Sequence, residues 1–225
     1  FLIFVFLENE NMKKIYLDNA ATTPLYPEVI ESMMSVLQND FGNPSSTHSY
    51  GRSAKNLLET ARKSIAKRLR IQASELIFTA HATEATNLIL QSAVQDIGIK
   101  RIITSKIEHH AILHTIDALV KEFGITVIYV DVDTNGHINY SQLETVLQSS
   151  KKQLVSLMHI NNEIGNKLDL KRVAELCKAN NALCHSDTVQ SVGHYKLDLQ
   201  DIKIDFLAAS AHKFHGPKGV GFAFI

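Results

Sequence analysis

The spacing of apolar and polar residues predicts an α/β chain. Between residues 52 and 70, apolar side chains recur every three or four positions, which predicts one long amphipathic helix. The same spacing predicts further helices at 27–38, from near Thr83, and at 110–122, 140–148 and 169–179. Short apolar runs rich in β-branched and aromatic residues predict strands at 75–79, 101–104, 125–130, 153–158, 182–186, 205–209 and 219–225. Because helices and strands alternate, the expected fold is a mainly parallel, mixed sheet flanked by helices.

Both ends of the chain depart from this pattern. Residues 1–11 open with an apolar run that is far shorter than a membrane span and has no basic leader or small-residue cleavage site. We expect them to be a non-native or extra segment, since Met12 resembles a natural start. The last predicted strand is still open where the chain stops at Ile225, so we expect a fragment of a longer protein.

Composition narrows the class of ligand. Lysine plus arginine and aspartate plus glutamate each number 23, so bulk charge predicts neither a nucleic-acid nor a membrane partner. With 45% hydrophobic and 20% charged residues the composition is that of an ordinary globular protein, which makes small-molecule chemistry the default. Cys177 and Cys184 are too few for a disulfide framework and fit no zinc or CxxC spacing, which predicts a reducing cytoplasm.

Polar residues gather just after five of the predicted strands. Ligands of open α/β sheets bind at the carboxyl ends of the strands, where loops lead into helices. The polar groups at these ends are Ala82-Thr83-Glu84, Glu108-His109-His110, Asn161-Asn162-Glu163, Asp187 to Gln190, and Ser210 to Lys213. We therefore expect the chemistry of the protein at this edge of the sheet.

Lys213 is the first candidate for chemistry. It follows the apolar strand predicted at 205–209 and precedes a Gly/Pro-rich turn at 215–219. An amine in a partly desolvated pocket beside other cations has a lowered pKa, which is what a lysine that forms a Schiff base needs. The alternative is a solvated surface lysine, and the sequence around Lys213 leaves both interpretations open.

Asp187 and Thr83 have two interpretations each. A carboxylate at the end of a strand can keep a pyridinium nitrogen protonated, but Asp187 could equally be a helix cap or turn residue. Thr83 opens a predicted helix, whose N-terminus favours a phosphate group, but it could be a helix cap without a ligand.

His109 could stack on an aromatic cofactor and serve as an acid or base near neutral pH. A metal site made by His109 with Glu108, His110 and His114 is not favoured, because the HExxH spacing and any further ligand set are missing. The glycine-rich stretch 216–221 lacks the phosphate-loop spacing and is interpreted as a turn.

Taken together, several short motifs occur in one characteristic order along residues 12–225. They are Tyr16 to Pro24, Phe41 to Ser46, Ala82-Thr83-Glu84, Thr104-Ser105-Lys106 with Glu108-His109, Met158 to Gly165, Asp187 with Gln190-Ser191, and His212 to Gly219. In this order they resemble the class V aminotransferase family of fold-type I pyridoxal-phosphate enzymes, and within it the cysteine desulfurases.

The resemblance implies a role for each matching residue. Lys213 would form the Schiff base with pyridoxal 5'-phosphate and shuttle protons, Asp187 would pair with the pyridine nitrogen, and His109 would stack on the ring and assist proton transfer. Gln190 would contact the ring hydroxyl, and Asn162 would line the substrate side. Thr83, Ser210 and His212 would hold the phosphate, and Ala82 would also contact the cofactor.

The resemblance also implies a domain organisation and a function. Residues 12–26 would join a small domain, and residues 27–225 would form an incomplete pyridoxal-phosphate-binding large domain. The enzyme would convert L-cysteine to L-alanine and transfer the sulfur as a persulfide for iron–sulfur cluster or thio-cofactor assembly. It would be a homodimer that serves a sulfur-acceptor or scaffold protein. The alternatives are a selenocysteine lyase, a class V aminotransferase, or a catalytically incomplete fragment or binding module.

Two departures from the family pattern are expected to matter. His81 and Ala211 stand where the family has glycine, and a side chain at either position could crowd the phosphate loop. The nucleophilic cysteine and the substrate-binding arginine of the family would both follow Ile225, so the chain alone is expected to be inactive. Cys177 and Cys184 fall in a predicted helix and core strand, where inert packing is expected.

Overall fold

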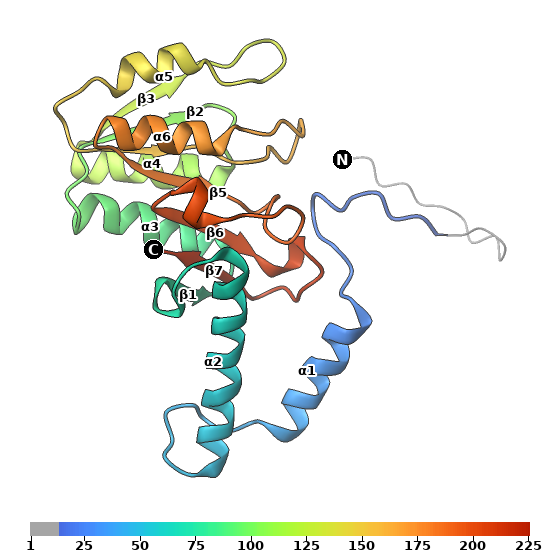
Figure 1. Ribbon diagram of the computed structural model, residues 1–225. Helices are drawn as coiled ribbons and strands as arrows, with labels where there is room; N and C mark the ends of the chain where they lie inside the picture. Colours follow the sequence, from blue (N-terminus) through green and yellow to red (C-terminus); the bar gives the residue numbers. More distant parts are fainter. Residues whose placement is uncertain (1–13) are drawn as a thin grey trace.

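The computed structural model describes residues 14–225 and is built around one seven-stranded sheet (Figure 1). Its strands are β1 (Leu76–Thr79), β2 (Arg101–Ser105), β3 (Thr126–Val130), β4 (Gln153–Ser156), β5 (Leu183–Asp187), β6 (Phe206–Ser210) and β7 (Gly221–Phe224). They lie in the order β1-β7-β6-β5-β4-β2-β3, and among these strands β7 alone runs antiparallel to its neighbours. The expected mainly parallel, mixed sheet is confirmed.

Seven α-helices accompany the sheet within residues 14–225. They are α1 (Pro27–Asn39), α2 (Ser49–Leu69), α3 (Ala82–Gln95), α4 (His110–Phe123), α5 (Tyr140–Leu147), α6 (Leu170–Ala179) and α7 (Leu199–Ile202), with 3-10 turns at Ala73–Glu75 and Ala211–Lys213. The helix predicted from residue 52 begins earlier, at Ser49, because the ring of His48 accepts a hydrogen bond from the Gly51 amide. The single turn of α7 is too short to produce a periodic pattern, and the sequence did not predict it.

Alternate strand residues supply the cores on the two faces of the sheet. Ile102, Leu154 and Ala208 pack with α3 and α4 on one face. Their neighbours Ile103, Val155 and Leu207 pack with α5, α6 and the end of α2 on the other face. Because both faces are covered, the central strands β2, β4, β5 and β6 are buried at nearly every position rather than at every second one.

Helix α1 and the first half of α2, residues 27–58, form an arm that extends away from the sheet (Figure 1). Helix α1 is amphipathic but has no buried residue, and its apolar side chains Ile30, Met33, Met34 and Leu37 are exposed. The helix predicted at 27–38 is present as α1. Its apolar face meets no partner in the described part of the chain. Within residues 14–225 no helix is long and apolar enough to cross a membrane.

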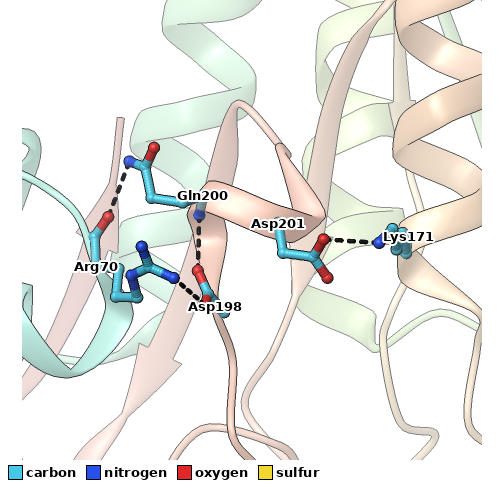
Figure 2. Close-up of polar contacts among 5 residues, drawn as sticks. All are labelled: Arg70, Lys171, Asp198, Gln200 and Asp201. Carbon is cyan, nitrogen blue, oxygen red and sulfur yellow. Dashed lines mark hydrogen bonds and ion pairs between the residues drawn. The ribbon is translucent and has the colours of Figure 1, made fainter.

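The inner end of α2 is held by a polar network (Figure 2). Arg70 ends the helix in a left-handed conformation, and its guanidinium lies 2.6 Å from the Asp198 carboxylate. Gln200 donates to the Arg70 carbonyl, while Lys171 on α6 pairs with Asp201 of α7 at 2.6 Å. Such exposed pairs contribute little to stability because water and salt screen them, so they orient α7 between two helices more than they stabilise the fold.

Candidate active site

One cavity of about 200 Å³ lies at the carboxyl ends of the central strands, beside the N-terminus of α3. The structure brings to it all nine residues predicted to contact the cofactor: Ala82, Thr83, His109, Asn162, Asp187, Gln190, Ser210, His212 and Lys213. They lie at the ends of β1, β2, β4, β5 and β6 or in the segments that follow, so the edge of the sheet indicated by the strand-end rule is the edge where this cavity lies.

Lys213 ends the 3-10 turn that follows β6 and is half-buried. Its ammonium group donates a hydrogen bond to the carbonyl oxygen of Ala20. Burial lowers the pKa of Lys213, and the negative charges of Asp187 and Asp18 oppose that shift. A lysine with a lowered pKa reaches the neutral, nucleophilic amine more readily than a solvated lysine.

Asp187 is the last residue of β5 and is only 7% exposed. Its Oδ1 accepts a hydrogen bond from the Val189 amide at 2.9 Å. Burial raises the pKa of Asp187, and the Val189 hydrogen bond together with the nearby charges of His109 and Lys213 acts in the opposite direction. The side chain can therefore hold a cationic ring nitrogen in a largely desolvated place.

His109 caps the N-terminus of α4 from the rim of the cavity. Its Nδ1 accepts a hydrogen bond from the Ala111 amide at 3.1 Å, so the proton of the neutral ring is on Nε2. The ring is exposed and borders both the cavity and a groove that Asn162 also lines. Its position suits a group that covers one side of a bound ligand.

The end of the cavity near α3 collects hydrogen-bond donors. Thr83 lies in the first turn of α3, and Ser210, 3% exposed, ends β6. The Nδ1 atom of His212 lies 3.1 Å from the Thr22 hydroxyl. Hydroxyl groups, an imidazole and the free amides of a helix N-terminus are the groups that bind a phosphate.

The two departures from the family pattern have different outcomes. His81 lines the cavity, where its Nδ1 accepts a hydrogen bond from the Glu84 amide at 3.1 Å and caps α3. Ala211 is not among the lining residues, and its methyl group stands 2.8 Å from where a side chain at Gly216 would begin. The side chain of Ala211 is thus directed to Gly216, and the expectation that it crowds the phosphate loop stays a prediction.

The N-terminal segment fastens onto the loop that carries Lys213. The Thr23 amide donates to the His212 carbonyl at 2.8 Å, and the His215 amide donates to the Thr23 hydroxyl at 2.7 Å. Tyr26 stacks on the His215 ring with centroids 4.0 Å apart. Residues near Thr23 were matched to a family motif, but no role was assigned to them because a contact of this sequence separation leaves no periodic signal.

Besides His81, four residues that line the cavity were given no role in the site by the sequence: Thr86, Ala111, Met158 and Val189. Thr86 is 1% exposed and lies three positions after Thr83, so helical spacing from Thr83 was a signal that could have identified it. Ala111 and Val189 each lie two residues after a predicted site residue.

Cys177 and Cys184 lie outside the cavity, and both are buried and free. The neighbouring Cys177 side chain has the largest effect on the pKa of the Cys184 thiol and raises it, and burial raises it further. This agrees with the inert packing expected for both residues. Within residues 14–225, no group of three or more histidine, cysteine or acidic side chains is arranged to hold a metal ion.

Known proteins share both the sequence and the fold. Cysteine desulfurase IscS of Clostridium botulinum is 42% identical over 215 residues, which cover 95% of this chain and 54% of that protein. A solved NifS-like protein superimposes with a TM-score of 0.90 at 38% identity, over 95% of this chain and 59% of that one. The structure of SspA in complex with cysteine gives a TM-score of 0.86 at 32% identity, over 93% and 60% of the two chains.

The fold and the cavity thus define a NifS-like α/β domain. Residues 15–225 match the aminotransferase class-V family, and the chain belongs to that family, whose members are pyridoxal-phosphate-dependent enzymes. The resemblance to the cysteine desulfurases is confirmed. The chain spans about half the length of the curated relatives that it matches.

Proposed function

We propose that the whole protein is a cysteine desulfurase and that this chain supplies the residues that hold its pyridoxal 5'-phosphate. The observation that carries the proposal is the single cavity that joins the half-buried amine of Lys213 to the buried carboxylate of Asp187. The ring of His109 and the N-terminus of α3 border the same cavity. These groups match, in turn, the aldehyde, the ring nitrogen, the ring face and the phosphate of the cofactor.

The donor set of the cavity fits this cofactor. The cofactor, when bound, withdraws electrons from the substrate carbon that its imine holds. Lys213 would hold the cofactor covalently and afterwards move a proton with the same amine. Asp187 would keep the ring nitrogen protonated, and Gln190 would contact the ring hydroxyl. Ala82, Thr83, Ser210 and His212 would hold the phosphate.

The substrate side of the proposal is L-cysteine, which the whole protein would convert to L-alanine while it passes the sulfur on as a persulfide. The support is that the C. botulinum relative is named a cysteine desulfurase and that SspA was solved with cysteine. Asn162 and His109 line the groove beside the cavity and would face the substrate. A sulfur-acceptor or iron–sulfur scaffold protein would receive the product.

We also propose a homodimer in a reducing cytoplasm. The exposed apolar side chains of α1, namely Ile30, Met33, Met34 and Leu37, support a second copy that covers the arm. The two free, buried cysteines support the reducing compartment.

The test of the proposed function uses the full-length protein. Lys213→Ala is expected to abolish the visible absorbance that pyridoxal 5'-phosphate gains when it binds a protein lysine covalently. The matched control is Lys178→Ala on the exposed side of α6, which should keep the spectrum of the wild type. A visible band that survives in Lys213→Ala would show that another amine holds the cofactor, and the assignment would be wrong.

A second measurement identifies the reaction that the whole protein catalyses. Supplied with L-cysteine, the loaded protein is expected to release alanine and sulfide in the presence of a reductant. Formation of a keto acid instead would identify an aminotransferase and exclude the desulfurase.

A further inference from the structure

Glu108 is a buried carboxyl group to which the proposed function gives no task. It lies between β2 and α4, next to His109, and is 6% exposed. Its Oε1 accepts hydrogen bonds from the Ser105 hydroxyl and from the Met158 amide, each at 3.0 Å. Its Oε2 is buried and meets no hydrogen-bonding partner in the described part of the chain.

These hydrogen bonds join the segments that frame the cavity. Met158 follows β4 and lines the cavity, and the next residue, His159, donates its amide to the Asp187 carbonyl at 2.9 Å. The ends of β2, β4 and β5 are thereby connected through Glu108, Met158 and Asp187. The two ends of this connection, Glu108 and Asp187, carry acidic side chains that are 6% and 7% exposed.

The cationic side chains near this pair lie on the side of Asp187. Burial raises the pKa of Asp187, and His109 and Lys213 oppose that shift. Glu108 has no such counter-ion, since its hydrogen bonds come from a hydroxyl and a backbone amide. Three further titratable groups, His137, Tyr140 and Lys167, line a small cavity of about 60 Å³ beside Glu108. Lys106, His110 and Glu163 line the groove on its other side. None of these groups forms a hydrogen bond or ion pair with Glu108 within residues 14–225.

Two neighbouring carboxyl groups in a desolvated place do not readily ionise together, and the one without a cation keeps its proton. Burial raises the pKa of Glu108 to about 8, and the negative charge of Asp187 adds to that effect against the two hydrogen bonds. Near neutral pH Glu108 is therefore mostly protonated and neutral.

We propose that Glu108 is a positioning residue that stays neutral and so keeps the single negative charge of the pair on Asp187, where the ring nitrogen of the cofactor would bind. Through its two hydrogen bonds it also fixes the start of α4, and with it His109, against the end of β4. The role of the Asp187 charge toward the ring nitrogen rests on the proposed function. The neutral state of Glu108 beside Asp187 is a property of the protein alone.

The first experiment needs no cofactor. Infrared spectra of the full-length apoprotein at pH 7 are expected to contain the carbonyl band of a buried protonated carboxyl group, which disappears in Glu108→Gln and is lost as the pH rises past about 8. Asp187→Asn removes the neighbouring charge and should move this titration to lower pH. If Glu108 is ionised at pH 7, or if Asp187→Asn leaves its titration unchanged, the inference is overturned.

The second experiment tests positioning in the loaded protein. Glu108→Gln keeps a neutral group and an oxygen acceptor for both hydrogen bonds, so it should bind pyridoxal 5'-phosphate nearly as the wild type does, with the same dependence of the visible band on pH. Glu108→Ala loses both hydrogen bonds and is expected to bind about tenfold more weakly, which corresponds to about 1.4 kcal/mol. A visible band that titrates at lower pH in Glu108→Gln than in the wild type would mean that Glu108 is charged, and it would overturn the inference.

The two proposals fail separately. If Lys213→Ala keeps the visible band but the infrared result holds, the proposed function is wrong and the neutral state of Glu108 stands. If Lys213→Ala loses the band but Glu108 is ionised in the apoprotein, the function stands and this inference is wrong.

Discussion

The ring nitrogen Nδ1 of His185 lies 2.9 Å from the hydroxyl oxygen of Ser156, and both residues are fully buried in adjacent strands. The other ring nitrogen, Nε2, has no partner in the described part of the chain. Burial lowers the pKa of His185 from 6.5 to about 3, so the folded protein holds a neutral imidazole over the whole physiological range.

Buried His185 makes a contribution to stability that is lost in weak acid. Between pH 6.5 and about 3, the unfolded chain binds a proton at His185 that the folded chain does not bind, so this contribution to the free energy of unfolding falls as the pH falls. At pH 5 the contribution is about 2 kcal/mol smaller than at pH 7, since one pKa unit corresponds to about 1.4 kcal/mol. Glu108, whose pKa burial raises to about 8, acts in the opposite direction over the same range, so urea unfolding at the two pH values measures the His185 contribution as the difference between the wild type and a His185 variant.

His185→Gln should reduce this pH dependence by most of that amount, whatever its effect on stability at pH 7. The exposed His114 provides the control, because His114→Gln should leave the dependence on pH unchanged. An equal loss of stability in the wild type and in His185→Gln would contradict the prediction. His159, whose pKa burial lowers to about 4, is expected to account for part of what remains.

The contact between Ala211 and Gly216 predicts a steric effect that a second substitution relieves. A Cβ atom at residue 216 would lie 2.8 Å from the Ala211 Cβ, which is closer than real Cβ atoms approach. Gly216→Ala is expected to destabilise the fold by about 1–3 kcal/mol, as overpacking does. Adding Ala211→Gly should restore part of the loss, because the pair would then be coupled rather than additive. Strictly additive unfolding free energies would show that the clash lies elsewhere.

His81 predicts a change in cofactor affinity that depends on the phosphate. Its ring occupies the surface of the cavity at the start of α3 and accepts the hydrogen bond of the Glu84 amide, which is then not free for an anion. His81→Gly releases both the space and the amide, and a hydrogen bond to a charged group contributes about 1.5–3 kcal/mol. We therefore expect pyridoxal 5'-phosphate to bind about tenfold more tightly to the variant.

Pyridoxal without its phosphate is the matched ligand and should bind the two proteins equally. His81→Asn keeps a side-chain acceptor for the helix cap and should resemble the wild type. If both ligands gain affinity alike in His81→Gly, the ring acts on the cofactor ring and not on its phosphate.

The sequence predicted the sheet and its active edge because those features are local. Alternation of strands with helices, and a polar residue after each apolar run, can be counted along the chain, as at Asp187 and Lys213. The charge state of Glu108 could not be predicted this way. It depends on the burial of Glu108 between three strand ends. It also depends on the fact that His109 and Lys213 act on Asp187, which only the folded structure determines.

The sequence also could not predict what covers helix α1. The apolar spacing of residues 27–38 predicted the helix, but periodicity does not say what covers its apolar face, and within residues 14–225 nothing buries it. The interpretation of residues 1–11 lies outside the described residues. The assignment of residues 12–26 to a small domain stays a prediction, although Thr23 is hydrogen-bonded to the loop of Lys213.

The bonds between Thr23 and His212 join residues 189 positions apart. During synthesis the first of these residues leaves the ribosome long before the second exists, and several helices and strands can form in between. Contacts of such long range form slowly, because a large loop must close before they contribute. The wall of the cavity next to Lys213 should therefore be one of the last parts of the nascent chain to acquire its shape, because Lys213 itself is synthesised only after His212.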